Sequence, residues 1–179
     1  MQFLLPLAAC IDALNERIGR WVSWLALAAI LISAGNALMR YSFRITSNAW
    51  LEIQWYLFSA FFLLAAGYAL KHNDHVRLDV LFTRVSPRTR AWIDILGTLL
   101  FLWPACTLIG WLAWPMFIDA WFSNEQSPDA GGLPRWPVKL LISLGFFLLI
   151  LQGLAELIKR IAYLRGLIAD PLTPLQHLR

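Results

Sequence analysis

The segment WLEIQWYLFSAFFLLAAGYALKHNDHVRLDV, residues 50–80, contains the clearest structural pattern in this chain. Its eighteen residues from 53 to 70 carry no charge, whereas Glu52 precedes them and Lys71 follows. Eighteen residues of α-helix rise roughly 27 Å, close to the thickness of bilayer hydrocarbon. The segment is therefore predicted to be a membrane-spanning helix whose charged flanks lie at opposite membrane surfaces.

Three further segments, at 21–39, 95–118 and 140–155, share this absence of charge. Of the 179 residues, 59% are hydrophobic and only 15% are charged, whereas about 25% are charged in ordinary globular domains. The connecting loops are shorter than the roughly 50 residues that a soluble domain usually needs. We therefore predict an all-α fold in a single membrane domain over 1–179, with four transmembrane helices and a C-terminal tail. Their expected bounds are about 21–41, 51–70, 92–121 and 137–158 for the helices and 159–179 for the tail.

The first twenty residues are expected to form a separate amphipathic helix. Apolar residues repeat at helical spacing on one face and charged residues lie on another, which is typical of a helix in the membrane interface. The apolar positions are Leu7, Ile11, Leu14, Ile18 and Trp21, and the charged ones are Asp12, Glu16 and Arg20.

The distribution of basic residues predicts the orientation of the helices. Eleven of the fifteen lysines and arginines lie before residue 21, between residues 71 and 94 or after residue 158, and four lie in the other two loops. Basic residues accumulate on the cytoplasmic side of membrane proteins. We therefore expect both termini in the cytoplasm, and we attribute the net charge of +4 to topology and not to nucleic-acid binding.

The predicted spans contain no residues suited to chemistry inside the membrane. The acids lie at span ends or in loops, so the buried carboxylate that proton-coupled export needs is missing. The histidines lie outside the spans, so axial ligands for haem are missing as well. Cys10 and Cys106 stand alone, which does not suit a redox pair. His72 and His75 supply two imidazoles, whereas zinc sites usually have three or four protein ligands. We therefore predict no enzyme activity, no catalytic residue, no metal and no cofactor.

Small, polar and kinking residues within the spans indicate how the helices pack. The small residues at 65–67 permit close helix approach, and Asn36 and Gln152 offer interhelical hydrogen bonds. Packing within the chain and packing against a larger neighbour both account for them. Pro104 and Pro115 each remove a backbone donor from the third span, for which we expect a static bend and not a hinge.

Five short motifs occur in order along the chain: Asn36-Ala37-Leu38-Met39-Arg40-Tyr41, Trp50-x-Glu52, Tyr56-Leu57-Phe58, Gly67 and His75-Val76-Arg77-Leu78-Asp79. Together with the four spans they resemble the small membrane subunit (DctQ type) of tripartite ATP-independent periplasmic (TRAP) transporters. The chain departs from that family at Leu51, where members often have a second acid, and at Trp55, where they often have a basic residue. Ion pairing that depends on either family residue is not expected here.

The resemblance implies a scaffold in a bacterial inner membrane. In such transporters the small subunit packs against a large membrane subunit, which holds the substrate and sodium sites and moves as an elevator. A periplasmic binding protein delivers the substrate, an organic acid. The implied partners are these two proteins and membrane lipid. The alternative is an accessory or assembly subunit of another bacterial inner-membrane complex, such as a respiratory or tripartite tricarboxylate system.

The family motifs supply the candidate residues for partner contact or structure: Asn36, Arg40, Tyr41, Trp50, Glu52, Gly67, His75, Arg77 and Asp79. Arg40 and Glu52 flank the first predicted periplasmic loop, either as a salt bridge, as a partner contact or as ordinary interfacial charges. Arg77 and Asp79 project to the same side only in an extended segment. We expect them to tie the end of the second span to its own loop or to the large subunit.

The predicted periplasmic loop at 119–139 has an acidic first half. Glu125 and Asp129 are candidates for docking the binding protein, because complementary charge raises association rates. A solvated loop without such a role is the alternative. The Pro134-Arg135-Trp136-Pro137 run is expected to direct the chain into the fourth span, since proline fixes φ and tryptophan favours the interface.

Overall fold

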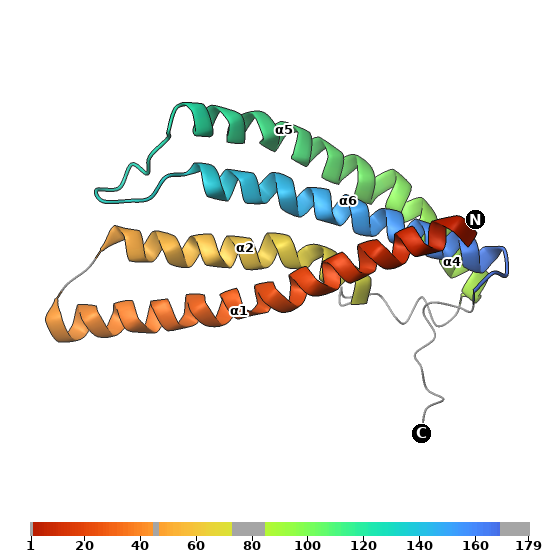
Figure 1. Ribbon diagram of the computed structural model, residues 1–179, viewed down its shortest axis with the longest axis horizontal. Helices are drawn as coiled ribbons and strands as arrows, with labels where there is room; N and C mark the ends of the chain where they lie inside the picture. Colours follow the sequence, from red (N-terminus) through yellow and green to blue (C-terminus); the bar gives the residue numbers. More distant parts are fainter. Residues whose placement is uncertain (1, 45–46, 73–84, 169–179) are drawn as a thin grey trace, which may run out of the picture.

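The computed structural model describes residues 2–44, 47–72 and 85–168, and within these ranges the chain is helical without a strand. After a short 3₁₀ turn, η1 (Gln2–Leu4), the main elements follow in the order shown in Figure 1. They are α1 (Leu5–Phe43), α2 (Asn48–His72), α4 (Pro87–Gly97), the π-helical segment η2 (Thr98–Leu102), α5 (Trp103–Phe122) and α6 (Trp136–Leu164).

Four helical stretches are long and apolar enough to cross a membrane: Leu5–Phe43, Asn48–His72, Pro87–Phe122 and Trp136–Leu164. The third is formed by α4, η2 and α5 in succession. Each stretch contains one predicted span, so the prediction of four helices able to span a membrane is confirmed. The start of α1 and the end of α6 lie at the same end of the molecule, and α2 ends in the half of the molecule nearer to it, beside Glu16 of α1 (Figure 1). The membrane side at which this end lies stays a prediction.

The first helix differs from its prediction, because α1 runs without interruption from Leu5 to Phe43. Its 39 residues rise roughly 58 Å, about twice the thickness of bilayer hydrocarbon. No proline follows Pro6 within α1, so nothing in the sequence ends the helix near residue 20. A separate interfacial helix over 1–20 is therefore not seen.

The buried face of α1 is also offset from the expected apolar face. Leu7, Leu14 and Trp21 stay exposed. The buried positions follow a neighbouring stripe of smaller and polar residues: Ala8, Ile11, Asn15, Gly19, Val22 and Ala29. Most large apolar side chains of the N-terminal half, with Ile11 as an exception, thus remain on the outside of the molecule, where a membrane would cover them.

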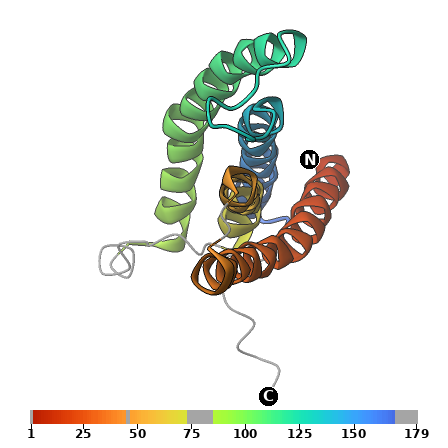
Figure 2. The ribbon, with the colours of Figure 1, turned by 90° about the vertical axis from the view of Figure 1, so that its left-hand side faces the viewer.

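The central helix of the fold is α6, which contacts α1, α2, α4 and α5. In Figures 1 and 2, α1 and α5 lie on opposite sides of the pair formed by α2 and α6. Close contacts to α6 depend on glycine: a Cβ on Gly145 would lie 2.8 Å from the Leu63 carbonyl oxygen of α2, and one on Gly153 would lie 2.7 Å from Leu102. The interior is therefore narrow, and most large apolar side chains face outward.

The third span contains a π-helical turn directly before Pro104, whereas the static bend expected at its prolines stays a prediction. The Trp103 N–H donates to the Thr98 carbonyl five residues earlier, which defines the π turn of η2. Pro104 has no N–H and its ring clashes with the preceding turn, so the helix widens directly before it. Pro115 lies inside α5, which continues past it.

Candidate functional site

A buried amide pair joins the first and last helices. Asn15 of α1 and Gln152 of α6 are both fully buried, and the Asn15 Nδ2 donates to Gln152 Oε1 at 2.9 Å. The Gln152 Nε2 in turn donates to Asp12 Oδ1 at 2.7 Å. Most buried polar groups in proteins are hydrogen-bonded, and of the Asn15 side chain the amide nitrogen is bonded whereas Oδ1 is not bonded to a described residue. This pair therefore fixes the register between the N-terminal half of α1 and α6.

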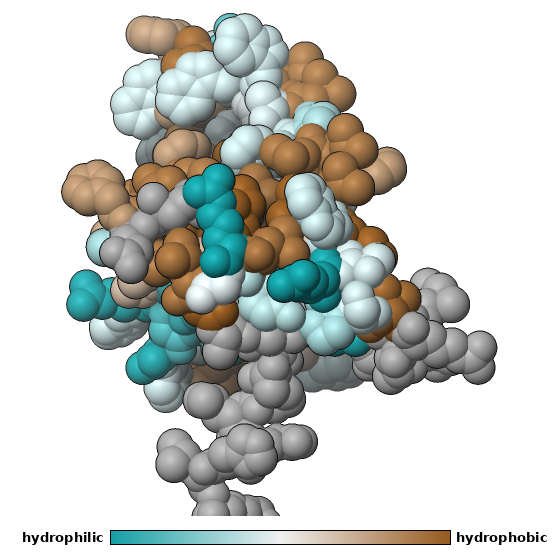
Figure 3. Space-filling view, turned by 90° about the vertical axis from the view of Figure 1, so that its right-hand side faces the viewer, coloured by the Kyte–Doolittle hydropathy of each residue, from teal (hydrophilic) through white to brown (hydrophobic). Residues whose placement is uncertain are grey.

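Ion pairs surround the amide pair and extend the contact to two more helices. Lys159 of α6 bridges Asp12 at 3.1 Å, and the Lys71 Nζ and His72 Nε2 of α2 lie 2.7 and 2.8 Å from Glu16. We call the whole group the N-terminal polar cluster. Its members are Asp12, Asn15 and Glu16 of α1, Lys71 and His72 of α2, Asp94 of α4, and Gln152, Glu156, Lys159 and Arg160 of α6. Figure 3 views this end of the molecule, where hydrophilic side chains lie in the middle and lower part of the view.

Arg160 is the most deeply buried charge of the N-terminal polar cluster, with 3% of its surface exposed. Its Nε lies 3.2 Å from Asp94 Oδ2 of α4. Breaking a buried pair leaves an uncompensated charge, which is strongly destabilising. Arg160 and Asp94 therefore hold α4 against α6.

The opposite end of the molecule is held by Glu52. One Glu52 oxygen accepts a hydrogen bond from the Ser127 hydroxyl, and the other accepts from the Leu133 N–H at 2.6 Å. The Tyr56 hydroxyl donates to the Pro134 carbonyl at 2.9 Å, and the Asn48 amide donates to the Ala130 carbonyl at 3.0 Å. The start of α2 thus binds the loop 123–135 between α5 and α6.

The two acidic docking candidates of this loop, Glu125 and Asp129, differ in whether they form an ion pair. Glu125 forms an ion pair with Lys139 at the start of α6. Asp129 is exposed, and no ion pair of its side chain is recorded within the described residues. Of the two docking candidates, Asp129 is the one whose charge is free to meet a partner.

Arg40 and Glu52, for which a salt bridge was one of three alternatives, do not pair with each other in the structure. Glu52 is bonded to the loop 123–135, and Arg40 is exposed near the end of α1 without an ion pair to any described residue. Tyr41 beside it is 89% exposed. The salt bridge is therefore not formed, because the loop donors reach the Glu52 carboxylate instead.

The other motif residues fall in three places. Asn36 and Trp50 line a groove of about 450 Å³ near the end of α1 and the start of α2. This small groove is separate from the α1–α2 groove described below. Gly67 is buried, and a Cβ there would lie 2.3 Å from the Asn15 Oδ1. Gly67 is thus a contact within the chain. His75, Arg77 and Asp79 lie outside the described residues.

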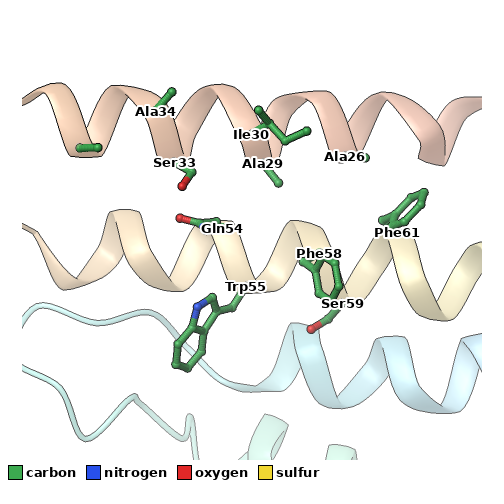
Figure 4. A pocket seen from close by; sticks show the side chains of 11 residues that line it. Ala26, Ala29, Ile30, Ser33, Ala34, Gln54, Trp55, Phe58, Ser59 and Phe61 are labelled. Carbon is green, nitrogen blue, oxygen red and sulfur yellow. The ribbon is translucent and has the colours of Figure 1, made fainter.

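Two larger grooves lie on the outer surface of the helices. The α1–α2 groove has a volume of about 810 Å³ and is lined by Ala26, Ala29, Ser33 and Ala37 of α1 with Gln54, Phe58 and their neighbours of α2 (Figure 4). The α5–α6 groove has a volume of about 610 Å³ and contains Trp111, Trp114 and Phe147. Exposed apolar patches of this kind mark contact with lipid or with another protein.

Sequence patterns identified some of these residues and missed others. Gln152 stands out as a polar residue within a span, and Glu52 as an acid at a span end. Asn15 and Arg160 gave no such signal, because each lies among other polar residues near a helix end. The available sign was that Asn15 lies on the same stripe of α1 as the small residues Ala8 and Gly19. A lone asparagine among small residues indicates a buried contact.

Together, the fold and these contacts define a helical membrane protein whose polar side chains hold its own helices and loop in place. Among the described residues, no group of three or more His, Cys, Asp or Glu side chains is placed to hold a metal ion. Residues 29–162 match the family described as "Tripartite ATP-independent periplasmic transporters, DctQ component". The match covers well over half of the chain, which therefore belongs to the DctQ family, a family of transporter subunits and not of enzymes.

The family match begins within α1, so Asp12, Asn15 and Glu16 lie outside it. The chain matches no protein in the comparison with curated proteins, and no match appears among solved structures. The family match favours a TRAP transporter subunit over an accessory subunit of another complex.

Proposed function

We propose that the chain is the small scaffold subunit that anchors the large, elevator-type subunit of a TRAP transporter. The complex takes up an organic acid with sodium after a periplasmic binding protein delivers the substrate. The chain is a multi-pass protein of the bacterial inner membrane with both termini in the cytoplasm.

The observation that carries this proposal is that hydrogen bonds and ion pairs connect the helices and the loop at both ends of the molecule. The N-terminal polar cluster joins α1, α2, α4 and α6 at one end, and Glu52 holds the loop 123–135 at the other. The surface between them is largely apolar. A rigid body with an apolar exterior suits the fixed part of a transporter against which another part moves.

Co-expression tests the proposal. The chain is co-expressed with a candidate large membrane protein and a candidate secreted binding protein from neighbouring genes, and we expect purification through a tag on this chain to recover the large protein in about equal amount. The candidate large protein is the probe, and an unrelated polytopic membrane protein is the control. Recovery of redox subunits in its place contradicts the proposal.

The exposed loop acid contributes to docking of the binding protein in this proposal. Asp129→Lys raises the concentration of binding protein needed for half-maximal uptake, and more so at low ionic strength, because salt screens exposed charges. Glu125→Lys is the comparison, since Glu125 is engaged by Lys139. A concentration dependence that is unchanged by Asp129→Lys at both ionic strengths leaves the loop with a structural role only.

A further inference from the structure

A small polar pocket of about 200 Å³, which we call the α4–α6 pocket, lies where α4 and η2 meet α6 near the end of α2. The Asp94 and Glu156 side chains in its wall keep 18% and 13% of their surface exposed, so a ligand can reach them from outside the molecule. The lining includes Leu70 of α2, Asp94 and Gly97 of α4, Thr98 of η2, and Glu156 and Arg160 of α6.

The charged groups of the α4–α6 pocket have hydrogen-bonding capacity left over. Arg160 is 97% buried, with 3% of its surface exposed. Its Nε lies 3.2 Å from Asp94 Oδ2, yet neither atom forms a directed hydrogen bond with the protein. Glu156 Oε2 lies 3.8 Å from Arg160 Nη2, which is beyond hydrogen-bond distance. Because buried polar groups are nearly always bonded to protein or to an ordered molecule, the pocket offers a guanidinium donor and two carboxylate acceptors to a ligand.

The α4–α6 pocket lies at the depth of lipid headgroups. In α6, residues 140–155 carry no charge, Lys139 precedes them and Arg160 follows twenty-one positions after Lys139. Twenty-one residues of helix rise roughly 31 Å, which is close to the thickness of bilayer hydrocarbon. With Lys139 at one membrane surface, Arg160 and the pocket beside it lie at the other.

The charges of the α4–α6 pocket select the kind of headgroup. Its lining carries two negative charges, from Asp94 and Glu156, and one positive charge, from Arg160. An anionic headgroup supplies no donor to the carboxylates, and a quaternary ammonium has no N–H to donate. A headgroup that joins a primary ammonium to a phosphate supplies donors for the carboxylates and an acceptor for the guanidinium.

We propose that the α4–α6 pocket binds the headgroup of a phospholipid with a primary ammonium, as in phosphatidylethanolamine. The ammonium donates hydrogen bonds to Asp94 Oδ2 and Glu156 Oε2, the phosphate accepts from the Arg160 guanidinium, and the acyl chains enter the bilayer. This inference goes beyond the proposed function and does not depend on it, because every lining residue belongs to this chain.

Lipid binding to the purified full-length chain tests the pocket. Phosphatidylethanolamine, phosphatidylcholine and phosphatidylglycerol with identical acyl chains are added in turn to the detergent-solubilised chain, and the bound lipid is counted by native mass spectrometry. We expect an affinity for phosphatidylethanolamine at least about tenfold higher than for either other lipid, because charge-assisted hydrogen bonds are the strong ones. Equal affinities for phosphatidylethanolamine and phosphatidylcholine overturn the proposal. Phosphatidylglycerol binding as tightly as phosphatidylethanolamine also overturns it, since attraction to basic residues then accounts for the binding.

A matched pair of substitutions tests where the lipid binds. Gly97 lines the α4–α6 pocket, and a Cβ there would meet nothing within 4 Å, so Gly97→Leu fills the pocket while the Asp94–Arg160 ion pair stays in place. Gly35→Leu is the control, because a Cβ at Gly35 of α1 also meets nothing within 4 Å. We expect Gly97→Leu to remove the preference for phosphatidylethanolamine and Gly35→Leu to keep it. A preference that survives Gly97→Leu, or that both variants lose, overturns the proposal.

A headgroup without acyl chains distinguishes a membrane lipid from a soluble ligand. Glycerophosphoethanolamine carries the same ammonium and phosphate but lacks the apolar chains that stabilise a lipid in the bilayer or the detergent micelle. We therefore expect it not to displace phosphatidylethanolamine from the wild-type chain at equal concentration. Displacement at equal concentration assigns the pocket to a soluble ligand and overturns the proposal of a lipid site.

Discussion

The buried amide pair allows a quantitative test of how α1 is held. Gln152→Met keeps the length of the side chain but removes the acceptor for Asn15 Nδ2 and the donor to Asp12. Asn15 Nδ2 then retains only the Ile11 carbonyl at 3.3 Å, while Lys159 still pairs with Asp12. A buried polar group left without its partner costs about 1–3 kcal/mol, and pairs measured in membranes contribute about 0.6 kcal/mol on average and at most about 1.7. We expect a loss of about 1–3 kcal/mol.

The double variant Asn15→Leu/Gln152→Met supplies the decisive comparison. Replacing both partners with apolar groups of similar shape is nearly neutral, so the double variant is expected to be more stable than either single variant. The measurement is thermal unfolding followed by the reactivity of Cys106, which is 4% exposed, in a Cys10→Ser background. With about 2–4 °C per kcal/mol, the single variants unfold about 4–8 °C lower for a loss near 2 kcal/mol. A double variant that loses the sum of the single losses refutes the interpretation of a coupled pair.

Two further variants test the other contacts that position the helices. Glu52→Gln removes the charge that accepts hydrogen bonds from Ser127 and Leu133. We expect this variant to speed hydrogen exchange across the loop 123–135, and we expect Asp129→Asn to leave the exchange rate unchanged. Equal exchange rates in the two variants contradict a holding role for Glu52. Gly145→Ala places a Cβ 2.8 Å from a backbone oxygen of α2 and should cost about 1–3 kcal/mol of unfolding free energy, whereas Gly97→Ala meets nothing within 4 Å and should be neutral or stabilising by up to about 1 kcal/mol. If the two alanine variants unfold at the same temperature, α2 and α6 do not approach as closely as described.

The four spans were predictable because their signal is local. The uncharged run at 53–70 lies wholly within α2, since the bilayer sets the length of such a run regardless of how the helices pack. The sequence predicted a bend at Pro104, because the missing N–H acts within one turn of the same helix, but not the π-helical form of the turn before it. The uninterrupted course of α1 was not predicted, because an amphipathic pattern does not show whether a helix ends.

Contacts between segments that are far apart in the sequence could not be predicted from sequence patterns. Glu52 was recognisable as a candidate, but its partners Ser127 and Leu133 are more than seventy positions away. Of the alternatives left open for Arg40 and Glu52, the structure shows no salt bridge between them, and a role in partner contact stays a prediction. The pairing of Asn15 with Gln152 depends on α1 crossing the end of α6, which requires the arrangement of the helices. The isolated position of Gln152 within an apolar span indicated one half of this contact.

The central claim is that this chain is the fixed scaffold on which a separate large subunit depends. The most direct measurement is sodium-driven uptake into liposomes that contain the co-purified large subunit with or without this chain, with the binding protein and its organic acid supplied outside. We predict uptake only when both membrane proteins are present, and none from this chain alone. Full uptake by the large subunit without this chain, or uptake by this chain without the large subunit, would contradict the account.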